Sequence, residues 1–356
     1  MRCLILAAGR FDADLKAGIS AGREPRLDVF ELANAMGADL LDFKDVESST
    51  RQSVQLTARS AGPSAALAVL GFMQRKRYDA YFTTGEDIGL PLAALLRAAR
   101  GRSSHTMIAH TLFPTKKQVF FRFGKVDRQI DRILVYSTSE QQLATGTLGV
   151  SAEKVERIAY HADDQFFRPN GTEPEPDLIC AAGQLLRDYD CLIEAVRTLP
   201  VRVDIAAGSP WIAQGLAPSR ALPPNITWRR RNRFELREMY AHARLAVVPI
   251  LQNHYQTGIA TILEMMSMGK CVIATRTHGQ TDTIVDGVTG VYVPPSDPAA
   301  LRGAIQRLLA QPADIERIGQ AARKYVEENA GLDLFVRRLR QTIEAGHAAR
   351  VNRNGA

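Results

Sequence analysis

The sequence predicts an α/β protein made of two doubly wound units. Short apolar, β-branched runs alternate with stretches of helical periodicity along most of the chain, which is typical of parallel sheets covered by helices on both faces. A Pro- and Glu-rich stretch at 169–176 interrupts this alternation and is the best candidate for a linker. The length of 356 residues fits about two domains of ordinary size.

The first predicted domain spans residues 1–168. Its apolar runs indicate strands at 3–8, 40–43, 80–83, 106–109, 133–136 and 155–159. Helical periodicity lies between them, at 27–36, 64–76, 90–100, 116–123 and 140–148. This order favours a parallel sheet, since each strand is followed by a helical crossover.

The second predicted domain spans residues 177–330. Its strands are expected at 178–182, 201–206, 226–228, 245–248, 271–274 and 290–293, and its helices include 189–199, 235–242, 298–309 and 315–327. A last helix is expected at 332–344, within a C-terminal segment at 331–350 that is separate from the second domain.

Composition excludes several classes of protein. With 46% hydrophobic and 23% charged residues, the chain is globular rather than disordered or fibrous. No apolar run approaches the ~20 residues of a membrane helix. The four cysteines form no C-x-x-C pair and are expected to be reduced core residues of a cytoplasmic protein. The formal charge of +7 suits an anionic substrate, an anionic membrane surface or nucleic acid, and does not choose among them.

The most informative stretch is 255–295. A polar loop, Gln256-Thr257-Gly258, leads into an apolar helix that ends at Gly269. The first N–H groups of such a helix form an anion site. Glu264 is the one charged residue inside the helix, and its carboxylate can accept hydrogen bonds from two sugar hydroxyls. Phosphate next to ribose is what a nucleotide presents.

This stretch resembles the retaining, two-domain glycosyltransferases of family four, which have the GT-B fold. The resemblance lies in Glu264 with MSMGKCVIAT, and in DGVTGVYVPP at 286–295. In that family a Glu holds the nucleotide ribose and a second Glu, eight residues earlier, contacts the donor sugar. The first role falls on Glu264 and the second on Gln256, which can bind hydroxyls but cannot supply negative charge.

The resemblance implies that the C-terminal segment at 331–350 forms a helix that packs back on the first domain.

The resemblance also implies the rest of a donor site. The helix start at Thr257, Gly258, Ile259 and Thr261 is expected to meet the nucleotide-sugar. Two more residues of this site follow the first strand of the second domain. Gly183 allows close backbone approach, and Arg187 is the nearest cation in a position where the family binds the donor diphosphate. The alternative for Arg187 is a surface side chain near a helix start.

A run of arginines at 229–233 ends a strand of the second domain. In the family this strand end lies near the nucleotide base, and Arg229 is therefore assigned to the donor nucleotide. A solvated charged loop and another anionic partner are the alternatives. No aromatic stacking pattern or DNA- or RNA-binding signature accompanies the run, so no nucleic acid partner is expected.

The first domain is expected to supply the acceptor side. His110 follows a strand in the context IAHTLFP, which is similar to the family's His at the cleft, and we place it with Gln256 and Arg187 among the catalytic residues. Gly18 belongs to a glycine-containing stretch after the first strand, expected to be a flexible loop near the acceptor. Glu86 and Asp87 follow another strand and are assigned either to the acceptor or, for Asp87, to helix capping.

Residues 115–125 mix aromatic and cationic side chains at helical spacing. Such a segment can lie on an anionic bilayer, or it can pack its aromatic face in the core and leave its lysines in water. The second interpretation is favoured. The first would place the protein at the inner face of a membrane.

The sequence thus predicts a retaining glycosyltransferase that moves a sugar from a nucleotide-sugar, preferably a UDP-sugar, to a hydroxyl acceptor such as a lipid or a cell-envelope glycan precursor. No histidine or carboxylate spacing indicates a metal site, and no cofactor is expected beyond the co-substrate. Two alternatives remain. One is an inactive nucleotide-sugar-binding protein, suggested by Gln256 and Gln184, and the other is a basic nucleic-acid-binding protein, suggested by the arginine run.

Overall fold

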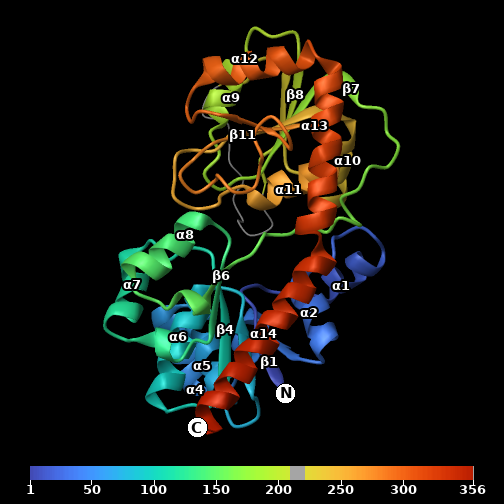
Figure 1. Ribbon diagram of the computed structural model, residues 1–356. Helices are drawn as coiled ribbons and strands as arrows, with labels where there is room; N and C mark the ends of the chain where they lie inside the picture. Colours follow the sequence, from blue (N-terminus) through green and yellow to red (C-terminus); the bar gives the residue numbers. More distant parts are fainter. Residues whose placement is uncertain (209–220, 356) are drawn as a thin grey trace. The chain divides into compact units, whose positions relative to one another are not determined.

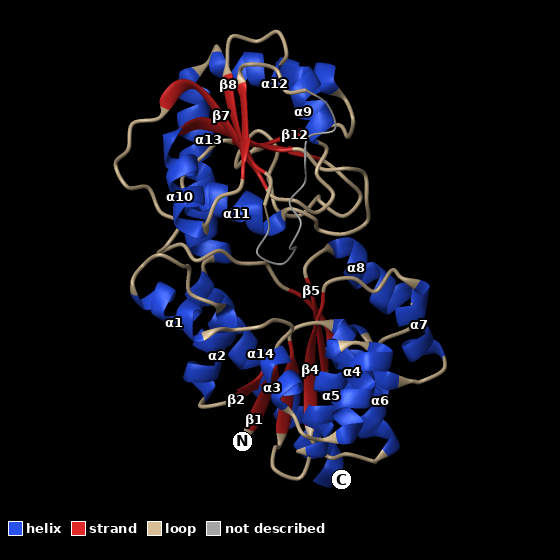
Figure 2. Cartoon of the chain, turned by 180° about the vertical axis from the view of Figure 1, so that it is seen from behind, coloured by secondary structure: helices blue, strands red, loops and turns tan. Residues whose placement is uncertain are grey.

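The computed structural model describes residues 1–208 and 221–355, which form two compact units (Figure 1). The first unit contains 1–17, 26–158 and 333–355, and the second contains 18–25 and 159–332. The chain therefore leaves the first unit after Ile158, before the Pro- and Glu-rich stretch. The predicted α/β class is confirmed, since the described residues form two parallel six-stranded sheets with helices on their faces (Figure 2).

The first sheet has the order β2-β1-β3-β4-β5-β6. Its strands are β1 Cys3–Leu6, β2 Asp39–Leu41, β3 Ala80–Thr83, β4 Ser104–Ala109, β5 Arg132–Val135 and β6 Val155–Arg157. All of the described pairings are parallel, so the carboxyl ends of β3, β4 and β5 lie along one edge of the sheet. The central strands are buried along their length because helices cover both faces.

Besides the helix at 13–20, which the sequence did not predict either, the helices of the first unit include an unpredicted pair. The helices are α2 Asp28–Met36, α3 Phe43–Ser48, α4 Gln52–Ala61, α5 Pro63–Met73, α6 Glu86–Ala98, α7 Thr115–Arg122 and α8 Thr138–Gln142, preceded by α1 Ala13–Ser20. The unpredicted pair is α3 and α4. Asp42 caps α3 in a reciprocal capping box with Asp45, and α4 packs along α5.

The second sheet has the order β12-β11-β10-β7-β8-β9. Its strands are β7 Glu175–Ala182, β8 Arg202–Ala206, β9 Ile226–Arg229, β10 Ala243–Val248, β11 Val272–Thr275 and β12 Val291–Val293. Its helices are α9 Tyr189–Val196, α10 Arg233–His242, α11 Ile259–Ser267, α12 Pro298–Leu309 and α13 Pro312–Tyr325. Along β7, Ile179 and Ala181 join one apolar core while Cys180 and Ala182 join the other, so the strand is buried on both faces.

The last helix, α14 Leu332–Gly355, is eleven residues longer than the sequence predicted. From residue 333 onward it groups with the first unit, and Figures 1 and 2 show it beside α2. Its extra turns are held by Asp131, a buried residue that accepts from Arg350 Nε at 3.2 Å and pairs with Arg353. A buried carboxylate is stable in such a place because two guanidinium groups compensate it.

All four cysteines are free and buried. Burial raises the pKa of Cys3, Cys180 and Cys271 to about 12, so these thiols stay protonated and act as small apolar side chains. Among residues 1–208 and 221–355, no helix has the length and apolar character that crossing a bilayer requires.

Candidate functional site

A pocket of about 560 Å³ lies at the carboxyl edge of the second sheet. The ends of β7 and β8, the start of α10 and the start of α11 form most of its wall. In open parallel sheets, ligands bind at this edge, in the crevice outside the strand ends. The position agrees with the sequence prediction, which placed the donor in the second domain.

The turn after β7 brings Gly183 and Arg187 together. Gly183 has φ +100°, and a Cβ there would lie 2.2 Å from Nη2 of Arg187, so only glycine leaves room for the guanidinium. Arg187 is buried rather than a surface side chain, and it donates to Ala182 O at 3.0 Å, Leu185 O at 2.9 Å and Thr261 Oγ1 at 3.2 Å. Burial lowers the pKa of Arg187 from its ordinary value, although a guanidinium stays charged.

The hydrogen bond to Thr261 ties Arg187 to the first turn of α11. Gly258 precedes this helix in the left-handed conformation, with φ +84°, and 256–261 line the pocket. The N–H groups of a first helical turn lack partners inside the helix. The site therefore combines a buried guanidinium with a helix N-terminus, and both favour an anion.

Glu264 lies one turn further along α11 and is buried at the pocket wall. Its Oε1 accepts from Arg233 Nη1 at 3.0 Å and its Oε2 from the Tyr240 hydroxyl at 3.3 Å. Burial raises the pKa of Glu264, and Arg233 and Tyr240 oppose that rise by stabilising the carboxylate. A carboxylate held in this way can accept hydrogen bonds from vicinal hydroxyl groups.

The arginine run divides between the pocket and the surface. Among the described lining residues are Arg230, Arg231 and Arg233, whereas the predicted Arg229 is absent from that set, and its side chain is 59% exposed. Arg231 forms an ion pair with Asp204. Sequence position alone did not distinguish Arg229 from Arg233, and the partnership of Arg233 and Tyr240 with Glu264 was missed because it joins residues more than twenty positions apart.

Gln256 lies at the pocket wall, where its Oε1 is buried and, within the described residues, lacks a hydrogen-bond donor. A buried carbonyl oxygen without a donor is costly, so this atom is suited to accept from a ligand hydroxyl. The structure places Gln256, Thr257, Gly258, Ile259 and Thr261 together, as the sequence motif predicted.

The predicted acceptor-side residues of the first unit gather at the ends of β3 and β4. His110 is exposed, and its Nε2 lies 2.9 Å from Thr84 O. Glu86 is buried and accepts from the backbone N–H of His110, whereas the side chain of Asp87 is 62% exposed. Asp87 is thus the member of this pair with a side chain open to solvent.

Gly18 does not lie in a flexible loop, which corrects the expected conformation of that stretch. It is part of the helix α1, in the segment 18–25 that groups with the second unit. A Cβ at Gly18 would lie 2.8 Å from Cγ of Glu24, so the glycine serves close packing there. Its predicted contact with an acceptor remains a prediction.

The segment 115–125 is divided between core and surface. Lys117 and Phe121 are buried, while Val119 and Phe123 are exposed by 45% and 81%. Lys116, Arg122 and Lys125 are exposed as well. The favoured interpretation, an aromatic core face with solvated lysines, is wrong for Lys117 and Phe123, because helix α6 supplies a buried carboxylate for Lys117 and no neighbour covers most of Phe123.

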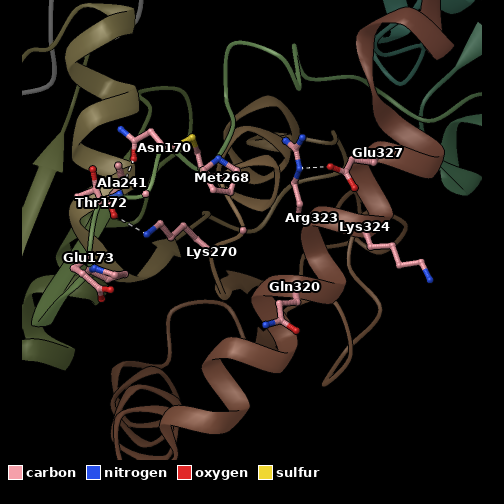
Figure 3. A pocket seen from close by; sticks show the side chains of 14 residues that line it. Asn170, Thr172, Glu173, Ala241, Met268, Lys270, Gln320, Arg323, Lys324 and Glu327 are labelled. Atoms are coloured by element: carbon pink, nitrogen blue, oxygen red, sulfur yellow. Dashed lines mark hydrogen bonds and ion pairs between the residues drawn. The ribbon is translucent and has the colours of Figure 1, made fainter.

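A second pocket of about 480 Å³ lies between the 169–174 stretch, the turn at 268–270 that follows α11, and α13 (Figure 3). Two of its basic side chains donate hydrogen bonds to backbone carbonyl oxygens. The Lys270 ammonium donates to Ala241 O at 2.7 Å and Ala243 O at 2.9 Å, so it caps the end of α10. Arg323 donates to Phe167 O at 3.1 Å and Ser267 O at 2.8 Å. These contacts give the pocket a structural role.

The described residues contain no group of three or more His, Cys, Asp or Glu side chains arranged to hold a metal ion. Within the described part of the chain, the pocket of the second unit offers an anion guanidinium groups and helix N–H groups.

Two doubly wound α/β units, each with a parallel sheet, are the architecture of the GT-B fold. The family model described as Glycosyl transferases group 1 matches residues 176–311, and these residues belong to that family. The match covers β7 to α12 and so includes most of the pocket described above.

Curated relatives agree with this assignment. Alpha-D-kanosaminyltransferase of Streptomyces kanamyceticus is 24% identical over 259 residues, 66% of this chain and 65% of that protein. D-inositol 3-phosphate glycosyltransferase of Thermobifida fusca is 26% identical over 185 residues, 50% of this chain and 42% of that protein. The matched part of the chain thus spans less than two thirds of the length of these relatives.

Solved structures share the fold across nearly the whole chain. HepE of Anabaena, solved in complex with UDP, has a TM-score of 0.70 at 14% identity and covers 97% of this chain and 100% of that chain. Sucrose-phosphate synthase of Thermosynechococcus elongatus has a TM-score of 0.71 at 17% identity and covers 98% of this chain and 100% of that chain. These likenesses establish the GT-B fold.

Proposed function

We propose that this protein is a glycosyltransferase that transfers a sugar from a nucleotide-sugar donor to a hydroxyl acceptor. The observation that carries the proposal is the combination of Arg187, the first turn of α11 and the buried Glu264 in one pocket. An anion site next to a hydroxyl-binding carboxylate fits a nucleoside diphosphate. The names of the relatives support it, since two are glycosyltransferases, and HepE was solved with UDP.

The donor that we favour is a UDP-sugar, and the stereochemical course is retention. The acceptor oxygen attacks the anomeric carbon on the face from which the diphosphate leaves, and the acceptor proton passes to the departing phosphate oxygen. Three of the five N–H groups of Arg187 donate within the unit, which fixes the guanidinium and leaves two N–H groups that can bind the leaving group. Gln256 orients the sugar through its carbonyl oxygen.

The acceptor side belongs to the first unit, where His110 and Asp87 lie at the strand ends. The Nε2 of His110 lies 2.9 Å from a carbonyl oxygen, which accepts only, so Nε2 carries the hydrogen. In the neutral ring Nδ1 is then an acceptor for a sugar hydroxyl. The exposed Phe123 and its basic neighbours support an anionic membrane surface as a partner, and hence a lipid or envelope-glycan acceptor.

The test is an incubation of the protein with UDP-, GDP- and ADP-sugars, followed by proton NMR of the anomeric signals. We expect slow release of sugar from one nucleotide class, with the first-formed anomer having the same configuration as the donor. Release of the opposite anomer contradicts retention. Binding of a donor without release or transfer supports the alternative of an inactive binding protein.

A further inference from the structure

Three buried charged side chains meet beside the connection that follows β4. Glu86 is the first residue of α6, Lys117 lies in α7 and Glu140 in α8, and they are only 3%, 8% and 2% exposed. These helices follow β3, β4 and β5, so the cluster lies at the carboxyl edge of the first sheet. Buried charges are costly, and their presence at this edge requires a reason.

The two carboxylates hold the backbone of one short loop. Glu86 Oε2 accepts from the N–H of His110 at 2.8 Å, and Glu140 Oε2 accepts from the N–H of Leu112 at 2.9 Å. Hydrogen bonds to an ionised acceptor are about twice as strong as neutral ones. Side chains from two helices thus accept hydrogen bonds from the backbone of this loop, at His110 and at Leu112.

The His110 ring is fixed on the same loop. Its Nε2 lies 2.9 Å from Thr84 O, and its centroid lies 5.4 Å from that of Tyr136. The ring can keep these contacts only while the His110 backbone stays in place. The hydrogen bonds of the loop backbone therefore control which ring nitrogen carries the proton.

We propose that Glu86 and Glu140 are positioning residues that hold the His110 loop, with Lys117 as the counter-ion of Glu86, and that they thereby fix the imidazole with its hydrogen on Nε2. The consequence for sugar transfer rests on the function proposed above, whereas the consequence for the imidazole does not. Lys117 pairs with Glu86 and, at 3.2 Å, with Asp87, so its charge is directed to α6.

Among the ion pairs of the described residues, Lys117 pairs with Glu86 and Asp87, and none joins a cation to Glu140. Burial raises the pKa of Glu140 to about 7, the charge of Glu86 acts in the same direction, and the Leu112 N–H, the Thr111 hydroxyl and Lys117 oppose it. The loop itself carries the titratable His110, and Asp87 pairs with Lys117. The hydrogen bond from the Leu112 N–H is accordingly strongest when Glu140 is ionised. The Glu140→Gln variant, whose side chain is neutral, mimics the protonated form of Glu140.

The experiment compares Glu140→Leu, which removes the acceptor, with Glu140→Gln, which keeps a neutral one, and with Glu153→Leu on an exposed site as the matched control. The readout is the ¹H–¹⁵N NMR spectrum of the imidazole groups in the full-length protein at pH 8, with His110→Gln used for assignment. We expect an Nε2–H tautomer for His110 in wild type and control, a mixture of tautomers in the Leu variant, and restoration in the Gln variant.

Turnover with the active donor should fall roughly 10- to 100-fold in the Leu variant, with partial rescue in the Gln variant and unchanged affinity for UDP. An unchanged His110 tautomer in the Leu variant overturns the proposal, whatever the activity. If the Leu variant does not fold, the amide signal of Leu112 decides: it must move between wild type and the Gln variant, and no movement overturns the proposal. A changed tautomer with unchanged transfer rejects the catalytic use of His110 and leaves the positioning role intact.

Discussion

The guanidinium of Arg233 lies 3.0 Å from the carboxylate of Glu264, across the wall of the pocket in the second unit. Tyr240 donates to the other oxygen of the same carboxylate at 3.3 Å. Burial raises the pKa of Glu264, and these two donors oppose that rise and orient the carboxylate before a ligand arrives. A preorganised acceptor costs a ligand less to engage than a mobile one.

Replacing Glu264 with Gln should weaken binding of UDP by roughly 10- to 100-fold, since charge-assisted hydrogen bonds contribute about 1.5–3 kcal/mol. Calorimetric titration of the full-length protein measures this. Glu238→Gln on α10, which pairs with Arg237 outside the described pocket wall, is the control and should bind as wild type does. Equal affinity of the two variants for UDP would show that Glu264 does not bind the ribose.

Gly183→Ala should lower the affinity for UDP, because the added Cβ would lie 2.2 Å from Arg187 Nη2 and displace the guanidinium. Gly171→Ala is a matched control, since Gly171 also has a positive φ, +81°, but nothing within 4 Å of the new Cβ. Both variants should lose about 1–2 kcal/mol of stability from backbone strain. Only Gly183→Ala should lose nucleotide affinity, and a loss shared by both would show strain alone.

The stability of the first unit should depend on pH through Glu140. Its pKa is raised from 4.5 to about 7 in the fold, so the folded state keeps the proton longer than the unfolded chain. The associated stability is fully present below pH 4.5 and is lost as the pH rises to about 7, on the order of 3 kcal/mol in all. Glu140→Gln should abolish this loss.

Urea unfolding at pH 5 and at pH 7.5 checks the prediction. The free energy of unfolding of Glu140→Gln minus that of wild type should be larger at pH 7.5 than at pH 5. A difference between the two proteins that stays constant with pH would mean that the Glu140 carboxyl titrates in the folded protein at its ordinary value.

Phe123→Ser should reduce binding to vesicles that contain anionic lipid about tenfold, since a buried Phe contributes about 1.5–3 kcal/mol. Leu56→Ser, which removes an apolar side chain that is 56% exposed on α4, is the control. Binding of the wild type should also fall with added salt because lysines and arginines contribute. Equal sedimentation of both variants with the vesicles would exclude the 115–125 surface as the contact.

The sequence predicted the strands well because buried parallel strands are nearly continuous apolar runs, as in β1 and β11. It missed α3 and α4, whose polar sequence has no clear apolar face before Asp42 and α5 are in place. Local motifs identified the α11 start and Glu264. They could not reveal Arg233, Tyr240 or Glu140, because these act through partners that only the folded chain brings near.

The central claim is that the pocket of the second unit binds a nucleoside diphosphate. The most direct measurement is a calorimetric titration of the full-length protein with UDP, GDP and ADP, with and without Mg²⁺. We predict saturable binding of one of them, preferably UDP, and a thermal stabilisation of about 2.7 kcal/mol at 100 times its dissociation constant. Absence of binding by all three under both conditions would contradict the account.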